Sequence, residues 1–355
     1  MKKDSRFKAF LRRKNIVFSA KRYGIDALGA MAQGLFVSLL IGTIIGTIGT
    51  QLKIDILVTV GDYAKQASGA AMAVAIGYAL QAPPLVLFSM VAVGMAANGL
   101  GGAGGPLAVL FIAIISAEFG KAVSKETKVD LIVTPFVTVT IGVLLSMLIA
   151  PWLGAAASKC GELIMWATDL KPFLMGIIVS VVVGCVLTLP ISSAAICAAL
   201  SLQGLAGGAA VAGCCAQMIG FAVMSYKENG VGGLLSQGIG TSMLQVPNIV
   251  KNPKIWIPPT LAAAITGPLA TCVFKMKMNG APISSGMGTC GFVGQIGVYT
   301  GWVEDIANGT KAAITAMDWI GLLMISIVLP AVLTLLIAIP FRKIGWIKEN
   351  DLKLE

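Results

Sequence analysis

Long apolar stretches alternate with short polar or glycine-rich breaks along most of the chain. The apolar stretches lie near residues 27–48, 68–98, 106–115, 131–153, 172–189, 194–202, 206–224, 233–246, 255–274, 281–299 and 319–341. A helix of about 20 apolar residues is long enough to cross the hydrocarbon core of a bilayer. The pattern therefore predicts an all-α integral membrane protein with about ten membrane segments, some of which do not cross fully.

Prolines and polar residues divide some of these stretches. Pro83 and Pro84 interrupt 68–98, which predicts either two helices or one helix and a re-entrant half-helix. Pro106 suits the first turn of a helix. The stretch 131–153 is a clear span, and 155–171 is amphipathic, so we expect a separate helix at the membrane surface there.

Composition supports the membrane interpretation. The chain is 57% hydrophobic and 12% charged, whereas a soluble domain has about 25% charged residues. The 42 glycines allow close packing of membrane helices. This much apolar sequence cannot be buried in one aqueous core, so the bilayer must be the solvent.

Positive charge is concentrated at the start of the chain. Residues 1–22 hold nine lysines and arginines and one aspartate, a net of +8 out of +10 for the whole chain. Positive residues stay on the cytoplasmic side, so we expect both termini, the second marked by Arg342 and Lys343, to be cytoplasmic. This basic leader either lies on anionic lipid or only sets the topology, and the concentrated charge argues against a nucleic-acid partner. We expect a cytoplasmic leader (1–25), a membrane transport domain (26–345, with possible halves 26–171 and 172–345) and a cytoplasmic tail (346–355).

Glu118 and Lys121 form an ionic island at the end of an apolar run that follows the glycine tract 98–105. Charged groups near a bilayer core are costly unless they are paired or face water. One interpretation is a polar pathway lined by Glu118. The other is a structural ion pair of Glu118 with Lys121 or with Lys125.

Breaks in apolar helices free backbone groups that lipid cannot satisfy, so they survive only against protein or water. Three breaks stand out, at 98–106, 190–193 and 279–295, and Pro-Ile-Ser-Ser occurs in both of the last two. We interpret 190–193 as tight helix packing, whereas 279–295 is either tight packing or a site for a neutral polyol or a carboxylate. The predicted substrate-binding residues are Asn98, Glu118, Asn279, Ser284, Ser285 and Gln295.

The chain has little that would support catalysis. It has no histidine, and its seven cysteines form no Cys-x-x-Cys pair and lie mostly in apolar runs, as buried structural thiols do. We therefore predict no metal, no cofactor and no catalytic residues, and the protein is not expected to be an enzyme.

Three runs carry a family resemblance: 104–135, with TKVDLIVTP; 252–277, with IWIPPT; and 281–298. They resemble a divergent, perfringolysin-regulator-like branch of the membrane IIC components of the bacterial sugar phosphotransferase system. The resemblance implies a glucose-superfamily IIC-like fold with re-entrant hairpins, usually a homodimer, that carries sugar while a separate IIB protein phosphorylates it. Such proteins contact sugar through a glutamate hairpin motif, often with a histidine, and this chain has neither.

We therefore predict an IIC-like permease in the bacterial cytoplasmic membrane that moves a small polar solute, a sugar or polyol, by alternating access. Two alternatives stay open: a transporter of an organic anion or lipid-like solute unrelated to phosphoryl transfer, and a membrane-embedded regulator. Transport predicts that polar substitutions along 279–295 abolish uptake. A regulator predicts that deletion of residues 1–22 is the damaging change.

Overall fold

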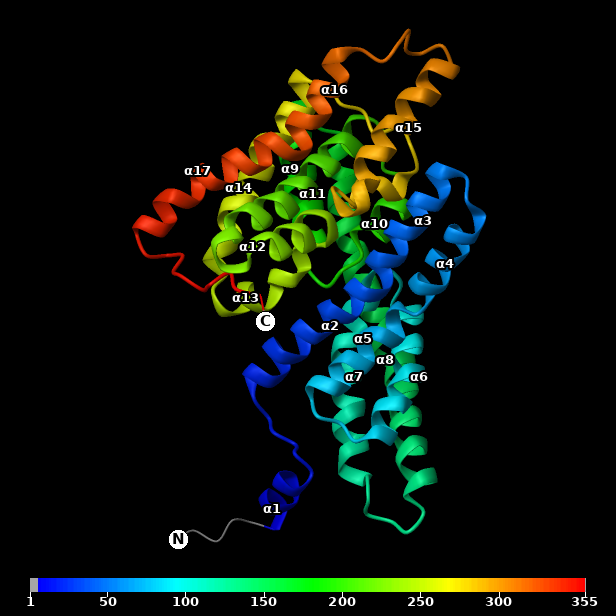
Figure 1. Ribbon diagram of the computed structural model, residues 1–355. Helices are drawn as coiled ribbons and strands as arrows, with labels where there is room; N and C mark the ends of the chain where they lie inside the picture. Colours follow the sequence, from blue (N-terminus) through cyan, green and yellow to red (C-terminus); the bar gives the residue numbers. More distant parts are fainter. Residues whose placement is uncertain (1–5, 355) are drawn as a thin grey trace. The chain divides into compact units, whose positions relative to one another are not determined.

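The computed structural model describes residues 6–354, and within that range the chain is built from helices and turns (Figure 1). Its one β-contact among these residues is an isolated antiparallel bridge between Gly204 and Met278. The chain forms two compact units. Unit 1 comprises Met1–Gly42 and Asp62–Ala155, and unit 2 comprises Thr43–Gly61 and Ala156–Glu355.

Unit 1 contains the first helices of the chain. They are α1 (Arg6–Arg13), η1 (Arg22–Asp26), α2 (Ala27–Leu35), η2 (Phe36–Leu40), α5 (Ser68–Ala79), α6 (Pro84–Gly101), η3 (Gly102–Gly104) and α7 (Gly105–Val123). Three helices have residues in both units: α3 (Ile41–Leu52), α4 (Asp55–Gln66) and α8 (Asp130–Thr168).

Prolines and a glycine determine where the unit 1 helices begin and end. Pro84 lies in the first turn of α6 and Pro106 in that of α7, where the missing N–H has no helical partner to lose. Gly102 between the two helices has φ +50°, a conformation that glycine adopts without strain. The stretch 68–98 therefore holds two helices, α5 and α6. That one of them is a re-entrant half-helix stays one of the two alternatives of the prediction.

The helices of unit 1 approach one another through small residues. A Cβ atom on Gly94 of α6 would lie 2.1 Å from the carbonyl oxygen of Gly69 in α5. Such contact between backbones is how membrane helices gain packing energy without bulky side chains.

Helix α8 differs from the sequence prediction. The predicted span at 131–153 and the predicted surface helix at 155–171 are one continuous helix, which contains Pro135 and Pro151. Its 39 residues correspond to about 58 Å of helix. The amphipathic character of 155–171 predicted a separate helix, but residues 155–157 are alanines, the strongest helix formers, and α8 continues through them.

Unit 2 contains the remaining helices. They are α9 (Pro172–Thr188), α10 (Ser193–Ala199), α11 (Gly204–Met224), α12 (Tyr226–Leu235), η4 (Ser236–Gly240), η5 (Ser242–Gln245), α13 (Val246–Lys251), η6 (Pro253–Trp256), α14 (Ile257–Pro268), η7 (Leu269–Val273), η8 (Pro282–Gly286), η9 (Cys290–Phe292), α15 (Val293–Ala307), α16 (Ala316–Leu323), η10 (Met324–Val328) and α17 (Leu329–Lys343).

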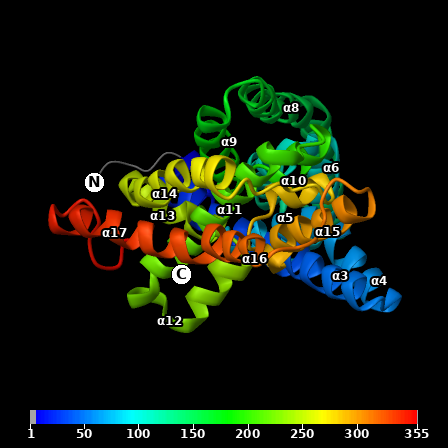
Figure 2. The ribbon, with the colours of Figure 1, turned by 90° about the horizontal axis from the view of Figure 1, so that it is seen from above.

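Helix α11 is the centre of unit 2. Most of its residues are buried, and it packs against α9, α14 and α17, which surround it in Figure 2. A Cβ on Gly213 would lie 1.8 Å from the carbonyl oxygen of Ser180 in α9, and one on Gly267 of α14 would lie 2.1 Å from that of Gly176. Glycines therefore bring α9 into backbone contact with both neighbours.

Six helical stretches among the described residues are long and apolar enough to cross a membrane. They are Arg22–Leu52, Pro84–Val123, Asp130–Thr168, Gly204–Met224, Pro253–Val273 and Ala316–Lys343. Two shorter apolar helices are Ser68–Ala79 and Pro172–Thr188. The helices agree with the predicted all-α membrane class, while the total of about ten segments stays a prediction.

Candidate functional site

The predicted site segment, 279–295, starts beside the first residue of α11 and runs along that helix. Just before it, Met278 exchanges two backbone hydrogen bonds of 3.0 Å with Gly204. Further along, Thr289 donates its hydroxyl to Sδ of Met218 at 3.6 Å. Gly204 and Met218 are 14 residues apart on one helix, so the segment advances about 21 Å along α11.

Helix α15 brings the chain back to the starting point of the segment. A Cβ on Gly301 of α15 would lie 2.7 Å from the backbone nitrogen of Asn279, and one on Gly280 would lie 2.3 Å from the carbonyl oxygen of Gly297. Residues 279–301, which we name the hairpin, therefore enter and leave at the same end of α11.

The two Pro-Ile-Ser-Ser motifs, 92 residues apart in sequence, meet in unit 2. Ser193, at the start of α10, donates its hydroxyl to the carbonyl oxygen of Gly286 in the hairpin at 2.7 Å. A Cβ on Gly286 would lie 2.6 Å from the carbonyl carbon of Ser193. Since Ser192 caps α10 by accepting from the N–H of Ala195, the beginning of this short helix lies directly against the η8 turn of the hairpin.

The polar residues of the hairpin differ in whether their hydrogen-bonding groups are already used. Ser285 is fully buried and donates to the carbonyl oxygen of Leu202 at 2.6 Å. Gln295 donates Nε2 to Sγ of Cys215 at 3.3 Å, while its Oε1 is buried and has no partner. The hydroxyl of Ser284 makes no hydrogen bond with another described residue. Ser284 and Gln295 therefore keep hydrogen-bonding capacity that the fold does not use.

Asn279 holds the base of the hairpin together. Its Nδ2 donates to both carboxylate oxygens of Asp305 at 3.0 and 2.9 Å, and its Oδ1 accepts from the N–H of Gly204 at 3.2 Å. These bonds join the start of α11 to the end of α15. Both Oδ1 and Nδ2 of Asn279 therefore make hydrogen bonds within the protein, as the polar groups of a positioning residue do.

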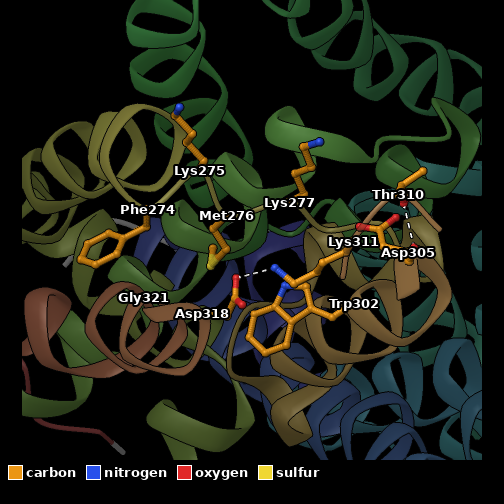
Figure 3. Close-up of a pocket in the computed structure, with 10 residues that line it drawn as sticks. All are labelled: Phe274, Lys275, Met276, Lys277, Trp302, Asp305, Thr310, Lys311, Asp318 and Gly321. Atoms are coloured by element: carbon orange, nitrogen blue, oxygen red, sulfur yellow. Dashed lines mark hydrogen bonds and ion pairs between the residues drawn. The ribbon is translucent and has the colours of Figure 1, made fainter. Parts of the chain in front are cut away.

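A polar cavity of about 160 Å³ adjoins this base (Figure 3). Its lining residues are Phe274, Lys275, Met276, Lys277, Trp302, Asp305, Thr310, Lys311, Asp318 and Gly321. Lys311 pairs with Asp318 at 2.8 Å, and Thr310 donates to the carbonyl oxygen of Asp305 at 2.9 Å, as the dashed lines show. The sequence did not predict this cavity, because its walls come from four separate segments of the chain. Trp302, taken alone, is equally typical of a residue at the membrane interface.

Asn98 lies in the helix packing of unit 1. Its Nδ2 is 3.4 Å from Oγ of Ser68 in α5. Glycines crowd it on two sides, since a Cβ on Gly105 would lie 2.5 Å from its Oδ1 and one on Gly69 would lie 2.7 Å from its Cβ. Asn98 thus links α5, α6 and the start of α7.

Glu118 pairs with Lys121, the first of the two partners that the sequence suggested. The Nζ–Oε2 distance is 2.8 Å, and Oε1 accepts from the hydroxyl of Tyr23 at 3.0 Å. Lys121, 1% exposed, also donates to the carbonyl oxygen of Leu80 at 3.1 Å. This buried cluster connects α7 to Leu80, in the turn after α5, and to Tyr23 in η1.

The basic leader is tied to the loop between α7 and α8. Arg13 pairs with Glu126 at 2.7 Å, and Lys14 bonds both to Glu126 and to the carbonyl oxygen of Ser124. The hydrogen bond from Lys14, helped by the charge of Arg13, lowers the pKa of Glu126 below its ordinary value. Part of the leader therefore contacts protein, and its predicted contact with anionic lipid stays a prediction.

Asn98 and Glu118 belong to unit 1, and the hairpin belongs to unit 2. That these residues face one solute stays a prediction. Within the described residues, no cluster of three or more cysteine, aspartate or glutamate side chains has the geometry to hold a metal ion.

Comparison with known proteins identifies the family. A family model described as Phosphotransferase system, EIIC matches residues 25–354. The chain belongs to this family. EIIC proteins are the membrane transport subunits of the phosphotransferase system, so this EIIC protein is a sugar-specific permease of the cytoplasmic membrane rather than an enzyme. No curated protein and no solved structure matches the chain.

The family match confirms the resemblance drawn from the three sequence runs. It also implies a partner, since an EIIC subunit works with a IIB component of the same system. The perfringolysin-regulator-like branch and the glucose-superfamily likeness stay predictions.

Proposed function

We propose that this EIIC protein carries a neutral sugar or polyol by alternating access and binds it against the hairpin, residues 279–301. The observation that carries the proposal is the return of the hairpin to the end of α11 where it began. In a membrane, a segment that enters and leaves on one side is a re-entrant hairpin, as the family resemblance implies.

The broken backbone of the hairpin supports this proposal. Residues 282–292 form two 3₁₀ turns joined through Gly288, whose φ is +53°. Several of their backbone groups have no helical partner, and such groups persist at membrane depth only against protein or a water-filled cavity. Discontinuous helices that meet in this way mark the binding sites of many transporters, and here the start of α10 meets the η8 turn.

The unused groups of the hairpin suit an uncharged, hydroxyl-rich solute. Oε1 of Gln295 is buried in this conformation, so it can accept a hydrogen bond from a sugar hydroxyl in a conformation of the transport cycle that uncovers it. The hydroxyl of Ser284 can donate or accept one. Neither group is charged, so neither requires an ionic ligand. In this proposal Asn279 and Ser285 position the hairpin, whereas Asn98 and Glu118 stay candidates from the sequence alone.

The distribution of basic residues in unit 2 supports a cytoplasmic carboxyl terminus. The residues at the carboxyl end of α11 and α17 include Lys227, Lys251, Lys254, Arg342 and Lys343, whereas the cavity at the other end of α11 has Lys275, Lys277 and Lys311. Positive residues concentrate on the cytoplasmic side. A homodimer, which the resemblance implies, is part of the proposal and can be measured as the mass of the detergent-solubilised particle.

Gln295→Met tests the site directly. Gln295→Met removes a buried oxygen without a partner and one hydrogen bond to the thiol of Cys215, which is a weak acceptor, so thermal stability should change little. If a sugar hydroxyl donates to this oxygen, sugar affinity should fall about 5- to 150-fold. The solute is first found by screening sugars and polyols for thermal stabilisation of the purified protein, and affinity is then measured by titration.

Ser285→Ala is the matched control. Its hydroxyl already donates to the carbonyl oxygen of Leu202, so its loss should lower stability by about 1–3 kcal/mol and change sugar affinity less than Gln295→Met does. If Gln295→Met binds the sugar as tightly as the unaltered protein, the sugar does not contact this residue.

A further inference from the structure

The chain after α17 folds back onto unit 2. Gly345 has φ +79°, a left-handed conformation that lets the backbone reverse direction at little cost. Beyond it, Ile347 and Leu352 are 2% and 0% exposed and pack in a cluster with Phe221 and Ile249. We name residues 346–354 the strap.

Side-chain amides hold the strap by its main chain. Asn229 and Gln245 both donate to the carbonyl oxygen of Leu352, at 2.8 and 2.9 Å, and Asn248 donates to that of Lys353 at 2.9 Å. In return, the N–H of Leu354 donates to Oδ1 of Asn229 at 2.8 Å. Contacts of this kind hold a peptide segment by its main chain, whatever its side chains are, as the main-chain bonds of peptide-binding domains do.

These amides are held in place by one another. Gln245 donates to Oε1 of Gln237 at 2.8 Å and accepts from Nδ2 of Asn248 at 2.9 Å, while Gln237 donates to Ser225 at 2.8 Å. All of them lie on the stretch 225–252, which runs from the end of α11 to α13. These amides, together with the apolar positions that Ile347 and Leu352 fill, form the surface that holds the strap, and we name this surface the groove.

At Glu228, binding of the strap to unit 2 is accompanied by an unfavourable burial of charge. Arg342 approaches Oε1 of this carboxylate at 3.3 Å, but Oε2 is buried and has no hydrogen-bond partner. Glu349 and Lys353 of the strap line the same cavity as Glu228, about 290 Å³ in volume. A buried carboxylate oxygen without a partner is unfavourable, and withdrawal of the strap would return it to water.

We propose that the strap is a releasable ligand of this groove, and that its release exposes both the groove and the pocket of Glu228 and Arg342. The strap occupies the groove as a segment with turns at 349–352, where Asn350 has φ +67°, and it is anchored by Leu352. The groove is the interaction surface, and the protein's own carboxyl-terminal segment is the partner that it fits.

Limited trypsin digestion of the full chain in detergent measures release, because cleavage after Lys348 or Lys353 follows the population of the open form. Leu352→Asp should be cut at least about tenfold faster than the unaltered protein, since the buried anchor is lost. The matched control is Ile344→Asp, which makes the same change at a position that is 68% exposed, and it should be cut at the rate of the unaltered protein.

Glu228→Gln tests the opposing cost. Loss of the buried charge should favour closure and slow cleavage about fivefold or more. Intact-protein mass spectrometry identifies the products, and thermal stability shows that each variant is folded. The proposal is overturned if Leu352→Asp and Ile344→Asp are cut at equal rates, or if Glu228→Gln is cut as fast as the unaltered protein or faster.

Discussion

Gly286→Ala probes the contact that brings the two Pro-Ile-Ser-Ser motifs together. A Cβ at this position would lie 2.6 Å from both the carbonyl carbon and the carbonyl oxygen of Ser193, and 2.8 Å from the nitrogen of Ala194. All three atoms belong to the backbone, so no side chain can rotate away. Either α10 or the η8 turn must move.

The expected cost follows from these contacts. Overpacking in a well-packed interior costs about 1–3 kcal/mol. Movement of α10 would also break the 2.7 Å hydrogen bond from Ser193 to Gly286, which contributes about 0.5–1.5 kcal/mol. We expect Gly286→Ala to lower the free energy of unfolding by about 2–4 kcal/mol and to impair sugar uptake.

Gly232→Ala is the matched control in the same unit. This glycine lies in α12 with no atom within 4 Å of its Cβ position, so alanine should gain up to about 1 kcal/mol from helix propensity. The assay is unfolding in dodecylmaltoside micelles as the fraction of SDS is raised, with sugar uptake measured in parallel in proteoliposomes. If Gly286→Ala is as stable as Gly232→Ala, the contact between the motifs does not exist.

Three further tests concern the charged groups of unit 1. The pKa of Glu126 is lowered in the folded protein, so the contribution of this carboxylate to stability is complete above the ordinary pKa of 4.5 and is lost as pH falls through the lower folded value. Hydrogen exchange of peptides from the leader, corrected for intrinsic rates, should therefore rise at acid pH. Glu126→Gln should show the same raised exchange at neutral pH. Lys121→Met should lower the free energy of unfolding by about 3–5 kcal/mol, because Glu118 stays buried without its cation. In the same assay, Glu118→Gln with unchanged stability and weaker sugar binding supports a role in the site, whereas lost stability with unchanged binding restricts Glu118 to the pair.

Local patterns in the sequence predicted the features that depend on neighbouring residues. The helical membrane class follows from apolar stretches, and the separation of α5 from α6 follows from Pro83 and Pro84. The pairing of Glu118 with Lys121 could be predicted because the two residues are three positions apart, which places them on the same face of a helix. The break at 279–295 was visible because glycines and serines interrupt an apolar run.

The contacts that organise the candidate site and the strap were not predictable in this way. Ser193 meets Gly286, Asn279 meets Asp305, and Asn229 meets Leu352 across 93, 26 and 123 positions of the chain. Each depends on how whole helices pack, which periodicity in a single sequence does not encode. The amides of Gln245 and Asn248 likewise bond to the carbonyl oxygens of Leu352 and Lys353 in the chain's own tail.

The most direct test of the central claim is hydrogen exchange of the purified protein with and without the sugar that most stabilises it. We predict that the sugar slows exchange in peptides covering 279–295, because a bound solute would occupy the unused groups of Ser284 and Gln295 and restrain the hairpin. Unchanged exchange at 279–295, with protection confined to other segments, would contradict the assignment of the hairpin as the sugar site.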